Sequence, residues 1–377
     1  MDVEHTQVLL GGLSPAQFMK RHWQKKPLLV RQAWPGVQAP LARPALFELA
    51  SRDDVESRLV QCMRDGSAEQ WRVRHGPLPR RALPPVSREG WTLLVQGLDL
   101  HVPAAHELLQ RFRFIPDARL DDLMVSWASD GGGVGPHLDA YDVFLLQVQG
   151  RRRWRVGRVR QPQWVPGAPL KRLHHFEPEA DWVLEPGDML YLPPNWGHDG
   201  VALGGDCMTC SVGFRVPAQD ELARDLLQRL GDEDVLPSPL YRDPQQPATL
   251  TPGAIPPQLQ NFAQRAVAQR LADPRWLARA LGETLSEPKA QVWFDATGAV
   301  WAGGAVRLSA RTKMLYDPQH VFINGEAFEA SGRDARLMRQ LADQRQLAAA
   351  EVSRLSPPAR ALLGQWVAAG WAEGEDI

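Results

Sequence analysis

The residues best suited to chemistry in this sequence are His137 and Asp139, which are one residue apart, and His198, which follows much later. Side chains alternate along an extended strand, so a strand over 136–141 would put His137 and Asp139 on one face. Two imidazoles and one carboxylate on a face of an octahedron hold iron(II) and leave three positions for a co-substrate and dioxygen. The pattern therefore predicts a non-haem iron site. A His-x-Asp tripeptide is short, however, and needs further support.

The sequence before His198 gives part of that support. A turn over 185–188, a short buried strand and a proline-rich bend lead to this histidine. The run resembles the second cupin motif, because Gly187, Pro193 and His198 are in register with it, whereas Asn195 stands where a glycine is usual. The alternative interpretation is a surface histidine on an ordinary hairpin.

An arginine occupies an inward-facing position on a predicted hairpin. Residues 143–148 predict an apolar strand and 151–156 the returning strand, on which Arg152, Trp154 and Val156 share one face. A buried guanidinium is costly unless an anion meets it, and its planar fork suits a carboxylate. Arg152 is therefore predicted to bind an anionic ligand. The alternative is a surface strand whose arginine pairs with an acid of the same protein.

A glycine-rich loop at 131–135 leads into the first metal ligand. Such a loop binds phosphate when a Lys-Ser/Thr pair and a helix follow it, and neither is found here. We interpret the glycines as giving the backbone positive φ angles and a close approach to a bound ligand.

Several long segments carry a family resemblance. They are 131–139 (Gly-Gly-Gly-Val-Gly-Pro-His-Leu-Asp), 141–144 (Tyr-Asp-Val-Phe), 150–157 (Gly-Arg-Arg-Arg-Trp-Arg-Val-Gly), 184–188 (Leu-Glu-Pro-Gly-Asp), 211–215 (Ser-Val-Gly-Phe-Arg) and the N-terminal stretch 18–30. On these segments the chain resembles the JmjC-type oxygenases, iron(II)- and 2-oxoglutarate-dependent enzymes built on a double-stranded β-helix. It is similar in particular to the bacterial ribosomal oxygenases, which hydroxylate an arginine of protein sixteen of the large ribosomal subunit.

The resemblance implies a role for each matching residue. His137, Asp139 and His198 would be the iron ligands, and Arg152 would anchor the distal carboxylate of 2-oxoglutarate, in agreement with the argument from its inward position. Ser126, on a strand predicted at 123–127, would give that carboxylate a second hydrogen bond. The loop 204–207 differs from relatives, which leaves one rim of the pocket undefined.

A peptidyl arginine would also need acidic or aromatic groups around its guanidinium. Asp130, Tyr141 and Asp142 flank the metal motif and are the candidates for this role. Each is equally plausible as a turn or hydrogen-bonding residue.

Three other functions compatible with these motifs are a JmjC-type N-methyl demethylase, a cupin metal enzyme that does not use 2-oxoglutarate, and a non-catalytic binding module. Arg152 discriminates against the second, because a dicarboxylate co-substrate is the ligand that needs it. Residues alone do not separate hydroxylation from demethylation.

The composition indicates an ordered protein of two or three domains. The chain has 377 residues, of which 44% are hydrophobic, and a net charge of −1. No apolar run approaches the length of a membrane span and the N-terminus lacks a secretory pattern, so we expect a cytoplasmic protein with no membrane partner. The three cysteines fit that compartment, and Cys207 and Cys210 are predicted to be two inert thiols, because residues three apart on a strand face opposite sides.

The expected fold class is mainly β with α: a double-stranded β-helix of the cupin/JmjC kind over 1–217, a helical dimerisation segment over 218–288 and a winged-helix-like domain over 289–377. Helices are predicted at 219–230, 258–271 and 275–281, with a proline-rich connection at 237–257. Their apolar residues exceed what a thin helical segment buries by itself, so we expect a homodimer. The alternative is packing on the β domain of the same chain. The apolar residues that favour a homodimer are Leu259, Phe262, Val267, Leu271, Trp276 and Leu277.

The last domain is predicted to contain a hairpin and two helices. Asn324-Gly325 between short apolar strands is a strong type I′ turn signal, and helices are expected at 334–346 and about 358–369. Residues 291–377 carry nine Lys or Arg and ten Asp or Glu, whereas binding to DNA phosphates favours a basic face. We therefore expect a protein-docking or architectural role and no DNA. A local patch at Arg333, Arg336 and Arg339 is the alternative.

Overall fold

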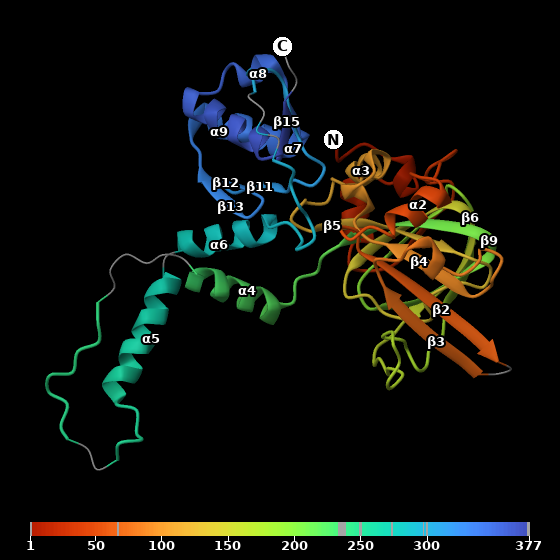
Figure 1. Ribbon diagram of the computed structural model, residues 1–377, viewed down its shortest axis with the longest axis horizontal. Coiled ribbons are helices and arrows are strands. Elements are labelled where there is room, and N and C mark those ends of the chain that lie inside the picture. Colours follow the sequence, from red (N-terminus) through yellow and green to blue (C-terminus); the bar gives the residue numbers. More distant parts are fainter. Residues whose placement is uncertain are drawn as a thin grey trace. The chain divides into compact units, whose positions relative to one another are not determined.

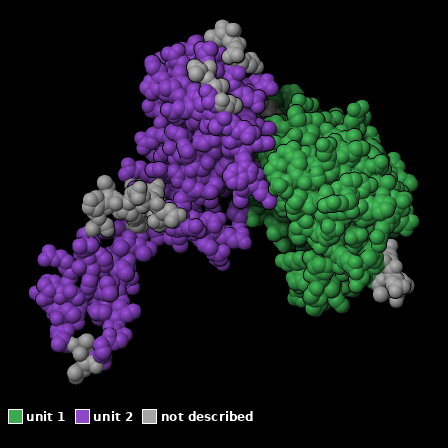
Figure 2. Space-filling model, in the orientation of Figure 1, with its two compact units in different colours: residues 1–216 green, residues 217–377 purple. Residues whose placement is uncertain are grey.

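The computed structural model describes residues 2–65, 68–232, 239–248, 251–272, 274–296, 298 and 301–374. Two compact units make up the chain, Met1–Val216 and Pro217–Ile377 (Figure 2). Parts of the predicted connection at 237–257 lie outside the described residues.

The first unit is built on one antiparallel sheet of nine strands (Figure 1). Eight strands follow the order β1-β8-β6-β9-β5-β4-β2-β3, and β7 pairs with β6. The strands are β1 (Leu28–Val30), β2 (Ser57–Asp65), β3 (Ala68–His75), β4 (Trp91–Val95), β5 (Leu120–Ala128), β6 (Asp142–Arg158), β7 (Ala180–Leu184), β8 (Met189–Leu192) and β9 (Trp196–Phe214). The helices are α1 (Pro15–Arg21), α2 (Arg43–Leu49) and α3 (Pro103–Gln110), with short 3₁₀ turns η1 (Val8–Leu10), η2 (Arg80–Ala82) and η3 (Leu98–Leu100).

Strands β6 and β9 are long enough to run through both halves of the fold. The first half of β6 pairs with β8 and the second half with β7, while β9 pairs with both halves. The register between β6 and β9 shifts between Gln147 and Arg151, where Gly150 has a φ of 65°. Such irregularities bend a strand and let it continue into a second sheet. The result is the predicted double-stranded β-helix.

Alternation along β6 separates the apolar core from the interior of the barrel. Phe144 and Leu146 belong to the main core of the unit, and the Phe144 ring lies 4.9 Å from that of Tyr191. Val143 and Leu145, one residue out of phase, line a cavity on the opposite face. The near-continuous apolar run predicted at 143–148 is therefore a strand that is buried on both faces.

The second unit combines helices with two small sheets. Its helices are α4 (Gln219–Asp232), α5 (Pro257–Ala272), α6 (Pro274–Ser286), α7 (Gly332–Gln344), α8 (Ala349–Val352) and α9 (Pro357–Ala368). One sheet has the order β14-β10-β15 and the other β11-β12-β13. The strands are β10 (Val306–Leu308), β11 (Met314–Tyr316), β12 (His320–Ile323), β13 (Glu326–Glu329), β14 (Gln346–Leu347) and β15 (Ala372–Gly374).

The predicted hairpin is present, since β12 and β13 are joined by Asn324 and Gly325, both with positive φ as a type I′ turn requires. One helix is longer than its sequence indicates. Helix α6 continues through Gly282 to Ser286, because Gly282 does not end the helix but lets the Phe322 ring pack against it. A glycine inside a helix can thus mark close packing instead of a C-terminus.

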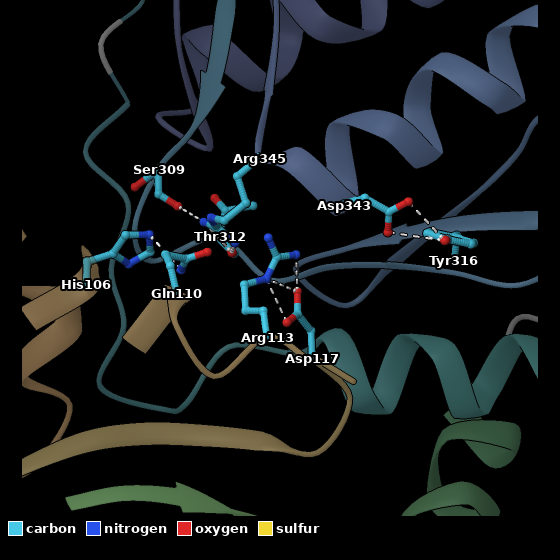
Figure 3. A network of polar contacts seen from close by, with 9 residues as sticks. All are labelled: His106, Gln110, Arg113, Asp117, Ser309, Thr312, Tyr316, Asp343 and Arg345. Atoms are coloured by element: carbon cyan, nitrogen blue, oxygen red, sulfur yellow. Dashed lines mark hydrogen bonds and ion pairs between the residues drawn. The ribbon is translucent and has the colours of Figure 1, made fainter. Parts of the chain in front are cut away.

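A polar network fixes the loops of the second unit. Arg345 follows α7 with a left-handed φ of 60°, and its guanidinium donates to the carbonyl of Ser309 at 2.6 Å and to that of Thr312 at 3.1 Å (Figure 3). A guanidinium with several donors satisfies carbonyls that no sheet or helix pairs.

Candidate metal centre and its cavity

The structure brings the three predicted ligands together in the first unit. Within the described part of the chain, His137, Asp139 and His198 form a group whose potential ligand atoms all lie within 4.8 Å of one another. The Asp139 Oδ2 atom is 3.8 Å from Nε2 of His137 and 3.4 Å from Nε2 of His198. Three donors that converge at such distances can share one metal ion.

Backbone pairing explains how residues so distant in sequence meet. His137 and His198 form an isolated antiparallel bridge, in which each backbone N–H donates to the carbonyl of the other at 3.0 Å. His198 lies on β9, so the bridge attaches the loop that carries His137 and Asp139 to the rigid barrel. The loop is thereby positioned by main-chain hydrogen bonds, independently of any metal.

Both imidazoles have the tautomer that a metal needs. Nδ1 of His137 is 2.9 Å from the carbonyl oxygen of Gly135, and Nδ1 of His198 is 3.0 Å from that of Trp196. A carbonyl oxygen accepts but cannot donate, so each Nδ1 carries the proton and each Nε2 offers its lone pair on the side of Asp139. Second hydrogen bonds of this kind orient metal-binding histidines.

The charges around the cluster keep Asp139 ionised. Without a metal ion, the histidines can also be protonated on Nε2. Burial alone would raise the pKa of Asp139, but the hydrogen bond from protonated His198 and the positive charges of the two histidines lower it to about 2. Burial, followed by the neighbouring His198, lowers the pKa of His137. Burial also acts to lower the pKa of His198, yet the Asp139 carboxylate outweighs it and the pKa of His198 is raised.

The glycine-rich loop is packed against protein. Gly135 has a φ of 77°, and a Cβ built on Gly133 would collide with the backbone of Gly200 on β9. The positive φ agrees with the sequence-based interpretation. The close approach, however, is to a neighbouring strand, whereas the sequence suggested a bound ligand.

Arg172 and Trp71 form a cation–π pair that packs against this loop. The Arg172 guanidinium lies 4.4 Å from the centre of the Trp71 ring on β3 and 3.9 Å from the Glu69 carboxylate. The Cδ atom of Arg172 would be 2.8 Å from a Cβ on Gly135, so the side chain presses on the residue whose carbonyl orients His137. Arg172 and Trp71 were not identified from the sequence.

Arg152 has the orientation that strand alternation predicts. It is 4% exposed on β6 and lines the same cavity as the three metal-binding residues, whereas Arg153 is exposed and pairs with Asp181. The Nε and Nη2 atoms of Arg152 are buried and have no hydrogen-bond partner in the described structure. Buried guanidinium nitrogens without partners are costly, so this side chain is arranged for an anion that enters the cavity.

The cavity has a volume of about 510 Å³ and joins the metal cluster to the barrel interior. Ser126 on β5 is buried and lines it, together with Met124 and Asp122 on the same face of that strand. Asp121 also reaches the lining. The sequence analysis missed Asp122, although its two-residue periodicity with Ser126 could have identified it.

The structure places two of the three proposed substrate contacts outside the cavity. Asp142 does not line the cavity: it is fully buried on the core face of β6, where the Tyr191 hydroxyl donates to it at 2.6 Å and Gln24 at 3.0 Å. Asp130 is exposed outside the cavity, and its carboxylate accepts from the backbone N–H of Gly204 at 2.7 Å. Both acids stabilise the fold, and the loop at 204–207 closes onto Asp130.

Tyr141 is the one of the three that does line the cavity. Its hydroxyl interacts with Asp139 and helps to lower the pKa of that carboxyl. Burial, followed by the charges of Asp139 and Asp122, raises the pKa of Tyr141, although part of the ring is open to the cavity. The phenol therefore stays protonated at neutral pH.

The cysteines do not take part in the site. Cys207 and Cys210 are buried and unpaired, and burial raises the pKa of Cys210 to about 12. A thiol with such a pKa is protonated at neutral pH and is a poor nucleophile and metal ligand. The prediction of two inert thiols agrees with this environment.

Family comparisons define the class of protein. Residues 107–222 match the family model of the JmjC domain, and residues 269–373 match that of the ROXA-like winged helix. Together the barrel, its three candidate metal ligands and these two matches describe a JmjC-domain protein with a C-terminal winged helix.

Individual relatives narrow the class. Ribosomal protein uL16 3-hydroxylase of Escherichia coli is 39% identical over 279 residues, which cover 72% of this chain and 71% of that protein. A probable ribosomal oxygenase of Haemophilus influenzae is 38% identical over 208 residues, which cover 54% and 50%. The chain belongs to the family of JmjC-type ribosomal oxygenases.

Solved structures agree with this family. An X-ray structure of Escherichia coli YcfD has a TM-score of 0.80 and 32% identity, covering 96% of this chain and 98% of that one. The ribosomal oxygenase YcfD in complex with cobalt and 2-oxoglutarate has a TM-score of 0.74 and 32% identity, covering 96% and 99%. The predicted fold class is confirmed by these matches.

A helix that crosses a membrane needs a long apolar stretch, and the helices in the described part of the chain provide none.

Metal affinity should depend on pH through one histidine. Asp139 is ionised at all ordinary pH values and the pKa of His137 is lowered, so His198, whose pKa is raised above 6.5, is the ligand that protons compete for. We expect the cobalt(II) affinity, measured by titration of the visible absorption, to be constant above the pKa of His198 and to fall about tenfold per pH unit below it.

The exposed His175→Ala variant should give the same profile. A loss of about a hundredfold per pH unit would mean that both histidines are protonated together, and a flat profile would mean that neither is a ligand.

Proposed function

We propose that this chain is an iron(II)- and 2-oxoglutarate-dependent hydroxylase that acts on an arginine of ribosomal protein uL16. The iron would be held by His137, Asp139 and His198. The distal carboxylate of 2-oxoglutarate would be bound by Arg152 and Ser126. The Escherichia coli relative is named as a uL16 3-hydroxylase, and YcfD was solved with cobalt and either 2-oxoglutarate or succinic acid.

One observation carries the assignment of the co-substrate. Arg152 lines the cavity that the metal cluster shares, and two of its guanidinium nitrogens are buried without partners in the described structure. A ligand that satisfies both features needs metal-binding oxygens at one end and a carboxylate at the other, as 2-oxoglutarate has. A cupin enzyme without a dicarboxylate co-substrate would leave this guanidinium unpaired.

When bound, iron(II) and the 2-oxo acid supply the oxidising chemistry, and the protein supplies position and environment. The two Nδ1 hydrogen bonds hold the imidazoles, and the Tyr141 hydroxyl holds the Asp139 carboxylate. Arg152 fixes one end of the co-substrate against the barrel wall. A rigid set of ligands decides which carbon of the substrate comes within reach.

The open side of the cavity suits a cationic side chain. Asp121 and Asp122 line it on β5, and Tyr141 faces the same space. Carboxylates bind a guanidinium through charge-assisted hydrogen bonds, and an aromatic ring can pack against its face. Asp122 and Tyr141 are thus the groups that we assign to the substrate arginine, in place of Asp130 and Asp142.

Arg152→Gln should weaken 2-oxoglutarate binding selectively. Loss of a charge-assisted pair costs about 1.5–3 kcal/mol, which corresponds to a rise of roughly 10- to 150-fold in the KM for 2-oxoglutarate. Arg153→Gln is the matched control, because Arg153 lies on the opposite face of the same strand. Equal KM values for the two variants would remove Arg152 from the co-substrate site.

Incubation of purified uL16 with this protein, iron(II), ascorbate and 2-oxoglutarate should add one oxygen atom to one arginine, as read by peptide mass spectrometry. His137→Ala should give no product, because it removes a metal ligand, whereas the exposed His175→Ala should be active. Asp122→Asn should raise the KM for uL16 at least tenfold and leave the KM for 2-oxoglutarate unchanged.

The outcome separates the proposed reactions. Loss of a methylene from a methylated peptide, with no oxygen gained by uL16, would indicate an N-methyl demethylase instead. Production of succinate with no change in uL16 would retain the oxygenase and exclude this substrate.

We propose that the second unit contains a helical dimerisation segment, 218–288, followed by the winged helix, 289–377, and that the protein is a homodimer in the cytoplasm. Every described side chain of α5 is exposed except Phe262, which is half-buried. Leu259, Val267 and Leu271 are 37%, 57% and 46% exposed. A helix with exposed apolar residues at helical spacing is stabilised when a second copy covers them.

Light scattering at micromolar concentration should give twice the chain mass for the wild type. Val267→Glu combined with Leu271→Glu should give a monomer, because two charges enter the contact. Gln258→Glu with Asn261→Glu adds the same charge at exposed polar positions on the opposite face of α5 and should be dimeric. A monomeric wild type would contradict the proposal.

A further inference from the structure

A second cavity, of about 920 Å³, lies wholly within the second unit. Four arginines line it, Arg275 and Arg279 from α6 and Arg336 and Arg339 from α7, against one lining carboxylate, Glu329. Within each helix the two arginines are three or four residues apart, so each pair lies on one face. The domain as a whole is close to neutral, which makes this local excess of positive charge informative.

The two helices are held firmly enough to define a site. Gly282 of α6 packs under the Phe322 ring, and the Ser286 hydroxyl accepts a hydrogen bond from the backbone N–H of Gly325 at 3.1 Å. These contacts attach α6 to the β12–β13 hairpin, which leads directly into α7. The spacing of the arginines is therefore set by packing in the unit.

Arg339 lines the cavity and is held in place by neighbouring residues. Its Nη2 atom donates to the carbonyl of Pro318 at 2.8 Å, and its guanidinium lies 5.7 Å from the centre of the Tyr316 ring. The Tyr316 hydroxyl is oriented by Asp343 at 3.1 Å (Figure 3). The Nε atom of Arg339 is buried and has no partner in the described structure.

The N-terminus of α7 adds to the positive potential. Ser331, the N-cap residue, makes no side-chain capping hydrogen bond, and Ser331 and Gly332 both line the cavity. The acid of the first turn, Asp334, is engaged elsewhere, because its carboxylate accepts from the backbone N–H of Ser356 at 3.0 Å. An uncapped helix N-terminus beside several guanidinium groups favours an anion.

Nearby carboxylates only partly offset this charge. Arg279 donates from Nε to Glu283 at 2.8 Å, and Glu329, the one carboxylate of the lining, is an exposed residue. Trp276, 37% exposed, also lines the cavity. Arginines combined with an accessible aromatic ring are the side chains that contact phosphates and bases in single-stranded RNA.

We propose that this cavity, lined by Arg275, Arg279, Arg336 and Arg339, binds the phosphodiester backbone of RNA. The anion site follows from the charges alone. The choice of RNA over another polyanion rests on the proposed function, because a ribosomal protein substrate is accompanied by RNA in the cell. The site would hold the enzyme near that substrate and take no part in the oxidation.

The test uses the full-length protein and a fluorescent single-stranded RNA of about 20 nucleotides, with binding followed by anisotropy. The wild type should bind with a Kd of roughly 1–100 µM at physiological salt and more tightly at low salt. Arg275→Gln with Arg336→Gln should weaken binding at least tenfold and reduce the slope of log K against log salt by about 1.4, the value for two lost phosphate contacts on a single strand.

Arg354→Gln with Arg360→Gln is the matched control, because both are exposed arginines of the same unit outside the cavity. It should bind RNA like the wild type, and both double variants should turn over 2-oxoglutarate normally. Equal loss in the two double variants, or no binding by the wild type at low salt, overturns the proposal.

Two further probes identify other occupants. Binding of poly-glutamate but not RNA, with the same sensitivity to Arg275 and Arg336, would assign the site to an acidic protein and overturn the RNA proposal. Binding of inorganic phosphate alone would reduce it to a small-anion site. Because RNA binding and 2-oxoglutarate turnover are measured separately, failure of this inference is distinct from failure of the proposed function.

Discussion

The antiparallel pairing of β6 with β9 is the constraint on which the site depends. This ladder runs through both halves of the barrel, places Arg152 on its inner face and carries His198 at the start of β9. The bridge between His137 and His198 then continues the same pattern of hydrogen bonds into the loop that holds the other two ligands. One backbone ladder therefore sets the relative positions of a metal site and an anion site.

Side-chain alternation along the strands makes the positions of Arg152 and of the three candidate ligands predictable from the sequence. The inward position of Arg152 follows from counting along a strand, and the three ligands follow from two short motifs with a strand between them. The Asn324-Gly325 turn was equally clear, because a type I′ turn needs positive φ at both residues. Such features depend on local geometry, which a sequence contains.

The sequence was less informative about side chains whose partners are distant in the chain. Asp142 looked like a site residue because it is close to the metal motif, yet it begins β6 on the core face, where the Tyr191 hydroxyl donates to it. Asp130 likewise has its partner at Gly204. Proximity in sequence to the metal motif did not identify the residues that line the cavity. Counting back along β5 from Ser126 in steps of two does identify Asp122. The Arg172–Trp71 contact joins strand β3 to the loop between β6 and β7, which are distant in sequence. No local sequence pattern predicts it.

The cation–π pair of Arg172 and Trp71 bears on how this enzyme class can diversify. Trp71 lies on β3 and Arg172 in the loop between β6 and β7, and neither segment contributes a residue to the main core, yet both side chains pack against the glycine whose carbonyl orients the first histidine. Evolution could therefore adjust the reactivity of the iron from the periphery. A change in these outer segments would reach the metal through one peptide group, while the hydrophobic interior that makes the protein fold would stay the same.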